Sequence, residues 1–469
     1  MTVATDPGTQ RLNPGVAPGV DAELTAEQRL ALGKSLRKQV RRQSHAAWQP
    51  VADRPSVVEF MRRDDEGRLD SLLPIRYQRM SESAFAYFRG SASVMAFDVA
   101  GAPSTGVYVQ LAGDAHLLNY GILGSPTGRL LFDVNDFDET LPGPWEYDVK
   151  RLAASATIAS RANSLDESTA RAVTLSSVRS YRLHTARLAG EPMIAVWDGH
   201  ADAEELVKSL PAADRAAASK TLRKAEKRSD LRAAEKLSVI VDGKAQIVDR
   251  PPLVDHGPFP DFDEDVVVAM LQEYGRSLSS DRRQLLERYR YADFALKVVG
   301  VGSVGTHDYA VLLEGSGGSG EDPLLLQLKE AKASCLEPYF GSSGTQNHAE
   351  RVVYGQRICQ SASDVLLGWS HDAATGRSYY WRQLWDHKGS FEPSAMSFQE
   401  LQSYVAFCGR SLAYAHARAG AAGRISGYLG RSDVFDRAIA DFAALYADQM
   451  ERDHAALVEA LDGGQLPRA

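Results

Sequence analysis

The sequence predicts an α+β fold with two lobes, a larger helical lobe and a small antiparallel sheet lobe. Long stretches such as residues 164–240 are rich in Ala, Leu, Arg, Lys and Glu, which favour helices. The hydrophobic period changes from 3.6 to 2 after about residue 290, which indicates strands, and becomes helical again after about residue 390. We therefore expect a disordered tail, a helical lobe, a sheet lobe and helices that return to the helical lobe, at residues 1–22, 23–290, 291–390 and 391–469.

The expected elements of the helical lobe follow from local patterns. The tail has almost no bulky apolar residues, so it cannot bury enough surface to offset the entropy lost on ordering. Beyond it, apolar periodicity predicts helices, and short apolar runs next to Gly and Pro predict strands. The expected helices span about 24–48, 84–99 and a long stretch after Pro144, and the expected strands span 107–111 and 130–132 on either side of a polar loop.

The sheet lobe is expected to begin with a meander of antiparallel strands. Three β-like runs are separated by Gly-rich segments, as in consecutive hairpins. A helix, a second hairpin and two closing helices follow. The expected strands span 294–299, 308–313, 324–329 and 379–384, and the expected helices span about 347–362, 397–419 and 431–461.

Composition and charge argue against several classes of protein. The chain has 469 residues, with 53 Lys and Arg against 61 Asp and Glu, and a net charge of −8, which disfavours a nucleic-acid-coating protein. No apolar run approaches the roughly 18–20 residues that span a bilayer, and the first residues lack the pattern of a secretory signal. The three cysteines are widely spaced, which disfavours a disulfide framework. We expect a cytoplasmic protein without nucleic-acid or membrane partners, and the oligomeric state stays open.

The first group of residues with chemical potential is Gly113-Asp114-Ala115-His116-Leu117-Leu118-Asn119, which precedes Asp133. Phosphoryl transfer to a hydroxyl needs a carboxylate that receives or orients the proton, and oxygen ligands that hold Mg²⁺ on the nucleotide phosphates. Asp114 can serve as the carboxylate. Asn119 and Asp133 can serve as metal ligands, with Asp136 close to them. His116 either orients Asp114, contacts a phosphate, or is an ordinary loop histidine.

The second group is the glycine-rich run Gly300-Val301-Gly302-Ser303-Val304-Gly305. Dinucleotide-binding folds place a helix directly after such a run, whereas the residues that follow here read as a strand. A glycine loop between two strands lets backbone amides approach phosphates. Lys329 ends the third apolar strand and is the expected phosphate-binding lysine, with Lys332 as a competitor. Glu350 is the expected acidic partner of Lys329, and Gln356 is a neutral alternative.

These motifs resemble those of the kinase superfamily. The Gly-Asp-x-His-x-x-Asn form is closest to the catalytic loop of the aminoglycoside phosphotransferase and choline kinase branch, although Ala112 stands where that branch has a His. The segment from Asp148 to Leu152 fits the same branch. In kinases the glycine loop and lysine precede the catalytic loop, whereas here they follow it. The resemblance therefore implies a circularly permuted, two-lobed protein-kinase-like fold.

The chain as a whole is similar to a bacterial family with a domain of unknown function, number 2252. The similar stretches are 33–48, 73–80, 85–90, 111–121, 132–153, 298–306 and 325–334. Arg76, Arg79 and Arg89 lie within or beside these stretches. They are expected either to bind an anionic substrate or to pair with the carboxylates of residues 133–148.

The resemblance implies an ATP-dependent phosphotransferase that uses Mg²⁺ or Mn²⁺ and acts on a small-molecule hydroxyl. The acidic run from Asp133 to Glu139 favours a cationic or polyhydroxyl acceptor. A nucleotide-binding pseudokinase and an AMP transferase of the same fold are alternatives. A metallophosphoesterase is the alternative from another class, because Asp114 and His116 form an Asp-x-His pair, but the further ligands of a two-metal site are missing from the sequence.

Overall fold

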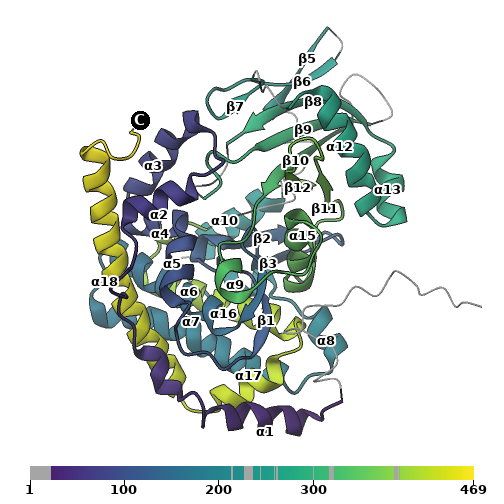
Figure 1. Ribbon diagram of the computed structural model, residues 1–469. Helices are drawn as coiled ribbons and strands as arrows, with labels where there is room; N and C mark the ends of the chain where they lie inside the picture. The colour runs from purple at the N-terminus through teal and green to yellow at the C-terminus, as the bar shows by residue number, and fades with distance from the viewer. Residues whose placement is uncertain are drawn as a thin grey trace, which may run out of the picture.

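The computed structural model describes residues 23–468 apart from 213–214, 227–235, 243, 258, 260–261, 299, 301, 316–321, 385–388 and 390. The expected tail at 1–22 lies outside the described residues. Figure 1 shows a helical part at the lower left and a sheet with its own helices at the upper right, which confirms the expected α+β class.

The N-terminal helices form one side of the helical part. Thr25 and Ser56 begin two of them, and each forms a capping box with the residue three positions later. The expected helix at 84–99 is broken at Ser91, where the backbone leaves the helical region. The elements are α1 (Ala26–Leu36), η2 (Arg42–Ala46), α2 (Val57–Asp64), η3 (Asp70–Leu72), α3 (Leu73–Ser81), α4 (Ala84–Gly90) and α5 (Ala92–Val99).

Two antiparallel strand pairs hold the polar loop that follows. The expected strand at 107–111 pairs with an unexpected strand at 141–144, and the expected strand at 130–132 pairs with an unexpected one at 120–124. These partners were missed because they contain Gly and Pro, which are rare in strands. The elements are β1 (Tyr108–Leu111), η4 (Leu117–Asn119), β2 (Tyr120–Gly124), β3 (Leu130–Val134) and β4 (Leu141–Pro144).

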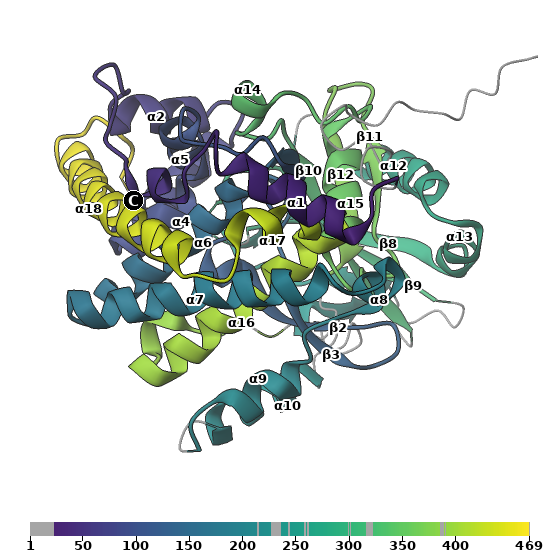
Figure 2. The same cartoon turned by 90° about the horizontal axis from the view of Figure 1, so that it is seen from below.

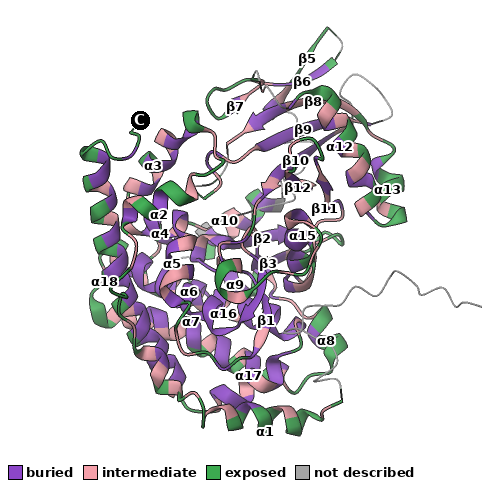
Figure 3. Ribbon diagram, in the orientation of Figure 1, coloured by how far each residue is buried: buried purple, intermediate pink, exposed green. Residues whose placement is uncertain are grey.

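Long helices supply the largest hydrophobic core. The helix α6 is buried along most of its length, and α16 packs against both α6 and α7 (Figure 3). The N-terminal segment packs on the C-terminal helices, because α1 lies beside α17 (Figure 2) and η2 contacts α18. These elements are α6 (Glu146–Ala162), α7 (Glu167–Leu188), α8 (Met193–Asp198), α9 (Ala203–Ser209), α10 (Arg215–Glu226), η5 (Pro393–Ala395), α16 (Phe398–Arg418), α17 (Ala422–Leu429) and α18 (Val434–Asp462).

The sheet has six antiparallel strands in the order β11-β12-β10-β9-β8-β7, so the expected three-strand meander and hairpin are confirmed as parts of a larger sheet. It begins before residue 291, because β7 precedes that point. The elements are β5 (Ser238–Val241), β6 (Lys244–Ile247), β7 (Val254–Asp255), α12 (Glu264–Ser277), α13 (Ser280–Leu286), β8 (Arg290–Lys297), β9 (Asp308–Glu314), β10 (Pro323–Ala331), α14 (Glu337–Phe340), α15 (His348–Cys359), β11 (Gly368–His371) and β12 (Ser378–Gln383).

None of the described helices combines the length and the apolar composition that a membrane span requires. The helical part and the sheet have separate hydrophobic cores. Charged residues lie between these cores, and they form the candidate site.

Candidate functional site

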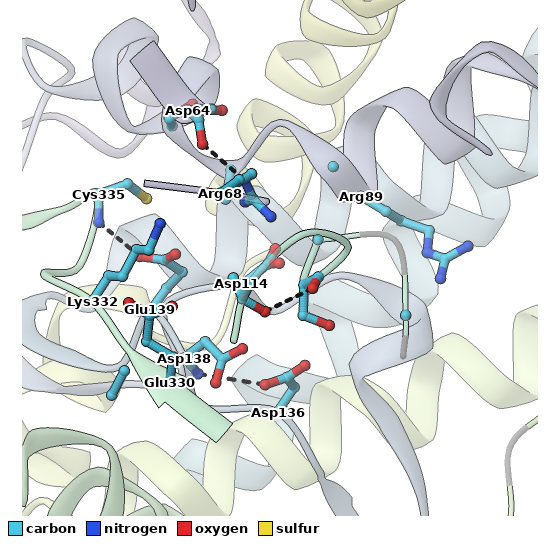
Figure 4. A pocket seen from close by; sticks show the side chains of 18 of the residues that line it. Asp64, Arg68, Arg89, Asp114, Asp136, Asp138, Glu139, Glu330, Lys332 and Cys335 are labelled. Carbon is cyan, nitrogen blue, oxygen red and sulfur yellow. Dashed lines mark hydrogen bonds between the residues drawn. The ribbon is translucent and has the colours of Figure 1, made fainter. Parts of the chain in front are cut away.

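A cleft of about 350 Å³ brings the two sequence motifs together. Its walls come from the polar loop, the acidic segment after β3, the glycine loop, the end of β10 and the N-terminal helices (Figure 4). Segments almost two hundred residues apart in sequence therefore share one cavity. The lining residues that carry the argument below are Arg63, Asp64, Arg68, Arg89, Asp114, His116, Asn119, Asp136, Asp138, Glu139, Gly300, Gly302, Ser303, Lys332 and Cys335.

Asp114 lines the cleft and is held from behind by a buried arginine. The Nε atom of Arg151 lies 2.8 Å from Oδ1 of Asp114, and Arg151 also donates to the carbonyl of Phe88 while its guanidinium stacks on that ring. The Nε2 atom of His116 lies 3.6 Å from Oδ2 of Asp114. Burial lowers the pKa of His116 to about 4, with Asp114 acting against the shift, so this imidazole is neutral at pH 7. Asp114 thus lines the cavity with its carboxylate held by Arg151 and beside a neutral imidazole.

The backbone that leads into Asp114 is fixed by the helix after β4. The carboxylate of Asp148 in α6 accepts the backbone N–H groups of Ala112 and Gly113, at 2.7 and 3.0 Å. Gly113 has a φ of +87°, and a Cβ atom there would lie 2.1 Å from the carbonyl oxygen of Glu139, so only glycine fits. The Nε2 atom of His416 in α16 lies 3.1 Å from Asp148. An imidazole therefore supports this loop, although Ala112 has replaced the expected leading His.

Two of the three expected metal ligands line the cleft, and the third does not. Asn119 lines it, and its side-chain NH₂ group donates to the carbonyl of Asp114 at 2.8 Å. Asp136 lines it as well, with 36% of its side chain exposed. Asp133 is buried in β3, and its carboxylate accepts the backbone N–H and the hydroxyl of Ser361, both at 3.0 Å. The convergence expected of Asn119, Asp133 and Asp136 therefore holds only for the first and the last.

Among the described residues, no group of three or more His, Cys, Asp or Glu side chains could hold a metal ion by itself. Mg²⁺ bound to a nucleotide keeps several waters and phosphate oxygens, so it needs only one or two protein carboxylates. Asp136 can supply such a carboxylate, and Asn119, which has an amide oxygen, lines the same cavity.

Lys329 lies in β10 and forms an ion pair with the acidic segment of the helical part. Its Nζ atom lies 2.7 Å from Oδ2 of Asp138 and 4.0 Å from Oδ1 of Asp136, and the hydroxyl of Tyr380 donates to Asp138 at 2.7 Å. Burial alone would lower the pKa of Lys329, but the two carboxylates outweigh it and hold that pKa well above its usual value. Burial and the neighbouring Asp138 raise the pKa of Asp136. The lysine therefore joins the sheet to the acidic segment.

Glu350 does not meet Lys329 in the structure. It lies in the first turn of α15, where its backbone N–H donates to the side chain of Asn347 and its carboxylate accepts the N–H of Gln346. The side chain of Gln356 donates to Gln360. The acidic partners of Lys329 are instead Asp138 and Asp136. These two residues belong to the acidic segment after β3, whereas Glu350 belongs to α15.

The glycine loop is held by residues that precede α3 or lie in it. Gly300 and Gly305 have φ values of +58° and +89°. The guanidinium of Arg79 donates to the carbonyl of Gly300, Arg68 donates to that of Val304 at 2.6 Å, and the backbone N–H of Leu69 donates to that of Gly305 at 2.7 Å. Gly300, Gly302 and Ser303 face the cleft from this anchored loop.

The three arginines singled out in the sequence have different surroundings. Arg76 is fully buried and pairs with Asp65 at 3.0 Å, so it neither faces the cleft nor pairs with residues 133–148. Arg79 holds the glycine loop. Arg89 lines the cleft, and within the described part of the chain its buried Nε atom has no hydrogen-bond partner.

Sequence reasoning missed four residues of this site. Asp138 belongs to the same acidic run as Asp136, and Arg151 belongs to the segment from Asp148 to Leu152, so both had a weak signal. Lys332 was considered only as a competitor of Lys329. Arg68 had no signal, because nothing in its neighbourhood shows that it reaches the glycine loop.

The fold and the site define a two-lobed α+β protein with a charged cleft between a helical part and an antiparallel sheet. The chain matches the model of a family described as an uncharacterized protein conserved in bacteria (DUF2252) over residues 68–460, and it belongs to this family. No curated protein and no solved structure matches the chain.

Proposed function

We propose that the protein is an ATP- and Mg²⁺-dependent phosphotransferase that acts on a hydroxyl group, with a circularly permuted kinase-like fold. The observation that carries this proposal is the shared cleft. Asp114, Asn119 and Asp136 face the glycine loop across it, and Lys329 lies behind the same acidic segment. Positioning and electrostatic stabilisation are what phosphoryl transfer requires of a protein.

Each residue has a role in the proposed reaction. The amides of the glycine loop bind the nucleotide phosphates, and Asn119 and Asp136 hold Mg²⁺, which neutralises charge on those phosphates. Lys329, which was expected to bind the phosphates, does not line the cleft and instead holds Asp138 and Asp136 in position from behind it. The acceptor oxygen forms a bond to the γ-phosphorus while the bond from that phosphorus to the β–γ bridging oxygen breaks. ADP leaves with the electron pair of the broken bond. The hydroxyl proton passes to Asp114 and then to solvent.

The contacts of α16 support the permuted order. In the proposed fold, α16 takes the place of the helix that leads into the catalytic loop. His416, near its end, lies 3.1 Å from Asp148, which binds the backbone of Ala112 and Gly113. By contrast, α4 and α5 are two short helices whose residues Arg89, Gly90, Ala92 and Ser93 line the cleft.

The metallophosphoesterase alternative has less support. A two-metal centre needs several His, Asp and Asn ligands around each ion. The described residues contain no such cluster, and His116 lies beside Asp114 as a neutral imidazole rather than in a ligand set.

The decisive experiment compares Asp114→Asn with the wild type. We expect the variant to bind Mg²⁺-ATP as the wild type does, and to lose phosphate transfer by about 10²-fold or more, because the amide keeps the shape of the side chain without its charge and basicity. Asp441→Asn is the matched control, because that residue is about half exposed on α18 and lies outside the cleft. ATP labelled at the γ- or the α-phosphate would be incubated with sugars, amino alcohols, aminoglycosides, phosphorylated or carboxylated alcohols and generic proteins.

Each outcome of this experiment has a meaning. Transfer of the γ-label to a small molecule that Asp114→Asn abolishes supports the proposal. Transfer of the α-label identifies an AMP transferase. A wild-type protein that binds no Mg²⁺-ATP, or an Asp114→Asn variant with full transfer, would show that the proposal is wrong.

A further inference from the structure

The cleft contains two cationic side chains that the proposed chemistry does not use. Arg68 lies between α2 and η3, and Lys332 lies one position beyond the end of β10. Both line the cleft on the side of the N-terminal helices, and Figure 4 shows Arg68 reaching from the region of Asp64 toward the catalytic loop. They define what we call the Arg68–Lys332 pair.

Both members of this pair are fixed by backbone carbonyls rather than by carboxylates. Arg68 donates to the carbonyls of Asp64 and Val304, at 2.8 and 2.6 Å, and Lys332 donates to that of Glu66 at 2.9 Å. Among the residues that the structure describes, neither forms an ion pair with an Asp or Glu. Carbonyl oxygens orient a cation, but they leave its net charge uncompensated.

The carboxylates near the Arg68–Lys332 pair already have other partners. The Oδ2 atom of Asp64 accepts the hydroxyl of Ser93 at 2.7 Å, and the carboxylate of Glu330 lies 2.9 Å from His307. Burial, followed by the nearby Arg76, lowers the pKa of Arg68 to about 10. Burial also lowers the pKa of Lys332, and Arg68 contributes to that shift. Nearby carboxylates act against these shifts, Asp64 on the pKa of Arg68 and Glu330 on that of Lys332, but among the described residues neither cation forms an ion pair with them. Two partly buried cations with no carboxylate in direct contact are costly unless a ligand supplies the negative charge.

The acidic run that favoured a cationic acceptor is largely neutralised in the structure. Asp133 faces away from the cleft, and Lys329 pairs with Asp138. The carboxylate of Glu139 accepts the backbone N–H of Cys335 at 2.7 Å. The carboxylates of the acidic run that line the cavity therefore have partners within the protein, and Asp136, with the longest contact to Lys329 at 4.0 Å, is the one placed to hold the metal.

From this arrangement we infer that the Arg68–Lys332 pair binds an anionic group of the acceptor, a phosphate or a carboxylate. The acceptor is then a small molecule that carries a hydroxyl group, presented to Asp114, and an anionic group, presented to the pair. This inference rests on the proposed function for the identity of the ligand as an acceptor. The glycine loop, Asn119 and Asp136 line the cleft and already provide for the nucleotide phosphates and their metal, so the pair is available for a second anion.

The experiment uses inorganic phosphate as the probe and the full chain as the protein. Calorimetry would measure phosphate binding to the free protein and to its complex with Mg²⁺ and a non-hydrolysable ATP analogue, in which the γ-phosphate position is filled. We expect phosphate to bind to that complex, and Lys332→Gln and Arg68→Gln to weaken it about tenfold or more, as expected for the loss of a charge-assisted hydrogen bond. The affinity of Lys332→Gln for the analogue should stay within about twofold, and Lys332→Arg should keep phosphate binding.

One control variant and the choice between the two test variants make the experiment decisive. Arg62→Gln removes an exposed arginine from the same helix as Arg63 but outside the cleft, and it should change neither affinity. Lys332→Gln is the more informative variant, because Lys332 donates to the carbonyl of Glu66, whereas Arg68 also holds the glycine loop.

The possible failures are distinguishable. If Lys332→Gln weakens binding of the ATP analogue but not of ADP, the pair binds the γ-phosphate and the inference is wrong. If phosphate binds neither the free protein nor the complex, the inference is also wrong. If the protein binds phosphate through this pair but no Mg²⁺-nucleotide, the anion site stands and the proposed phosphotransferase function fails.

Discussion

Asp133 and Asp136 are three positions apart, yet they serve different parts of the molecule. The carboxylate of Asp133 is a buried acceptor for the backbone after α15, whereas Asp136 faces the cleft beside Asp138. Substitution of Asp133 should therefore change the stability of the fold, whereas substitution of Asp136 should change ligand binding. Comparing the two variants separates a structural carboxylate from a ligand-binding one.

We expect Asp133→Asn to lower the free energy of unfolding by about 1–3 kcal/mol, because the amide cannot accept all the hydrogen bonds of the buried carboxylate. Asp136→Asn should leave that free energy nearly unchanged, because its side chain is 36% exposed and the substitution relieves repulsion from Asp138. It should instead abolish the stabilisation that Mg²⁺ and an ATP analogue give to the wild type. Urea unfolding and thermal melts with and without Mg²⁺ measure both effects, and a reversed pattern would return the metal role to Asp133.

A buried histidine far from the cleft makes stability depend on pH. His45 is fully buried against the hydroxyl of Tyr428, and burial, followed by the charge of Lys150, lowers its pKa to about 3. The unfolded chain binds a proton there near pH 6.5 and the folded chain does not, so stability falls as pH drops from 6.5 toward 3.

His45→Phe removes this titration while keeping an aromatic ring. Relative to its value at pH 7, the wild type should lose about 2 kcal/mol more than the variant at pH 5, given 1.36 kcal/mol per pH unit. Urea unfolding at several pH values gives the two slopes. Parallel slopes would mean that His45 is protonated in the folded state.

At the scale of elements, the sequence allowed prediction of the parts whose pattern is local. Each strand of the meander from β8 to β10 contains a short apolar run, and α15 and α16 have clear helical periods, so these elements were predicted within a few residues. The strands β2 and β4 contain Gly and Pro and are strands because pairing with β3 and β1 buries them completely. Such pairing depends on residues elsewhere in the chain, and local strand propensity carries no information about them.

The candidate site shows the same division. Asp114, Asn119 and the glycine loop were found because their spacing is set within one loop, and they line the cleft. Choosing correctly between Asp133 and Asp136 required the directions of their side chains. Finding the partner of Lys329 required the position of α15 relative to β10. Spacing along the chain carries neither kind of information.

The glycine loop offers a prediction with an internal control. Gly305 has a φ of +89°, and a Cβ atom there would lie 3.2 Å from the Cβ of Arg68, so Gly305→Ala should cost about 1–2 kcal/mol of stability. Gly302 has no positive φ, and its added Cβ would lie 3.8 Å from the nearest atom, the carbonyl oxygen of Arg89. Gly302→Ala should therefore leave the melting temperature of the free protein unchanged and weaken nucleotide binding, because Gly302 faces the cleft. Equal melting temperatures for the two variants would contradict the described loop conformation.

At the scale of the whole molecule, segments near both ends of the chain pack together in the helical part, whose N-terminal helices line one side of the cleft. The family match begins at residue 68, yet the preceding segment packs into the helical part, with α1 against α17 and η2 against α18. Arg54 joins three segments, because its guanidinium pairs with Asp98 of α5 at 2.7 Å and with Asp453 of α18 at 2.6 Å. The exposed fractions of these side chains are 9%, 1% and 5%, so the network is shielded from water.

Arg54→Gln should destabilise the whole protein, because it leaves the carboxylates of Asp98 and Asp453 buried without their cation. The expected loss is about 3–5 kcal/mol in the free energy of unfolding, the usual cost of removing one partner of a buried ion pair. Arg171→Gln is the matched control, because Arg171 pairs with Asp441 on the same helix α18, but the two side chains are 39% and 50% exposed. Its loss should stay below about 1 kcal/mol. Urea unfolding monitored by circular dichroism measures both, and similar losses in the two variants would mean that the Arg54 network does not bind the chain ends to the cleft wall.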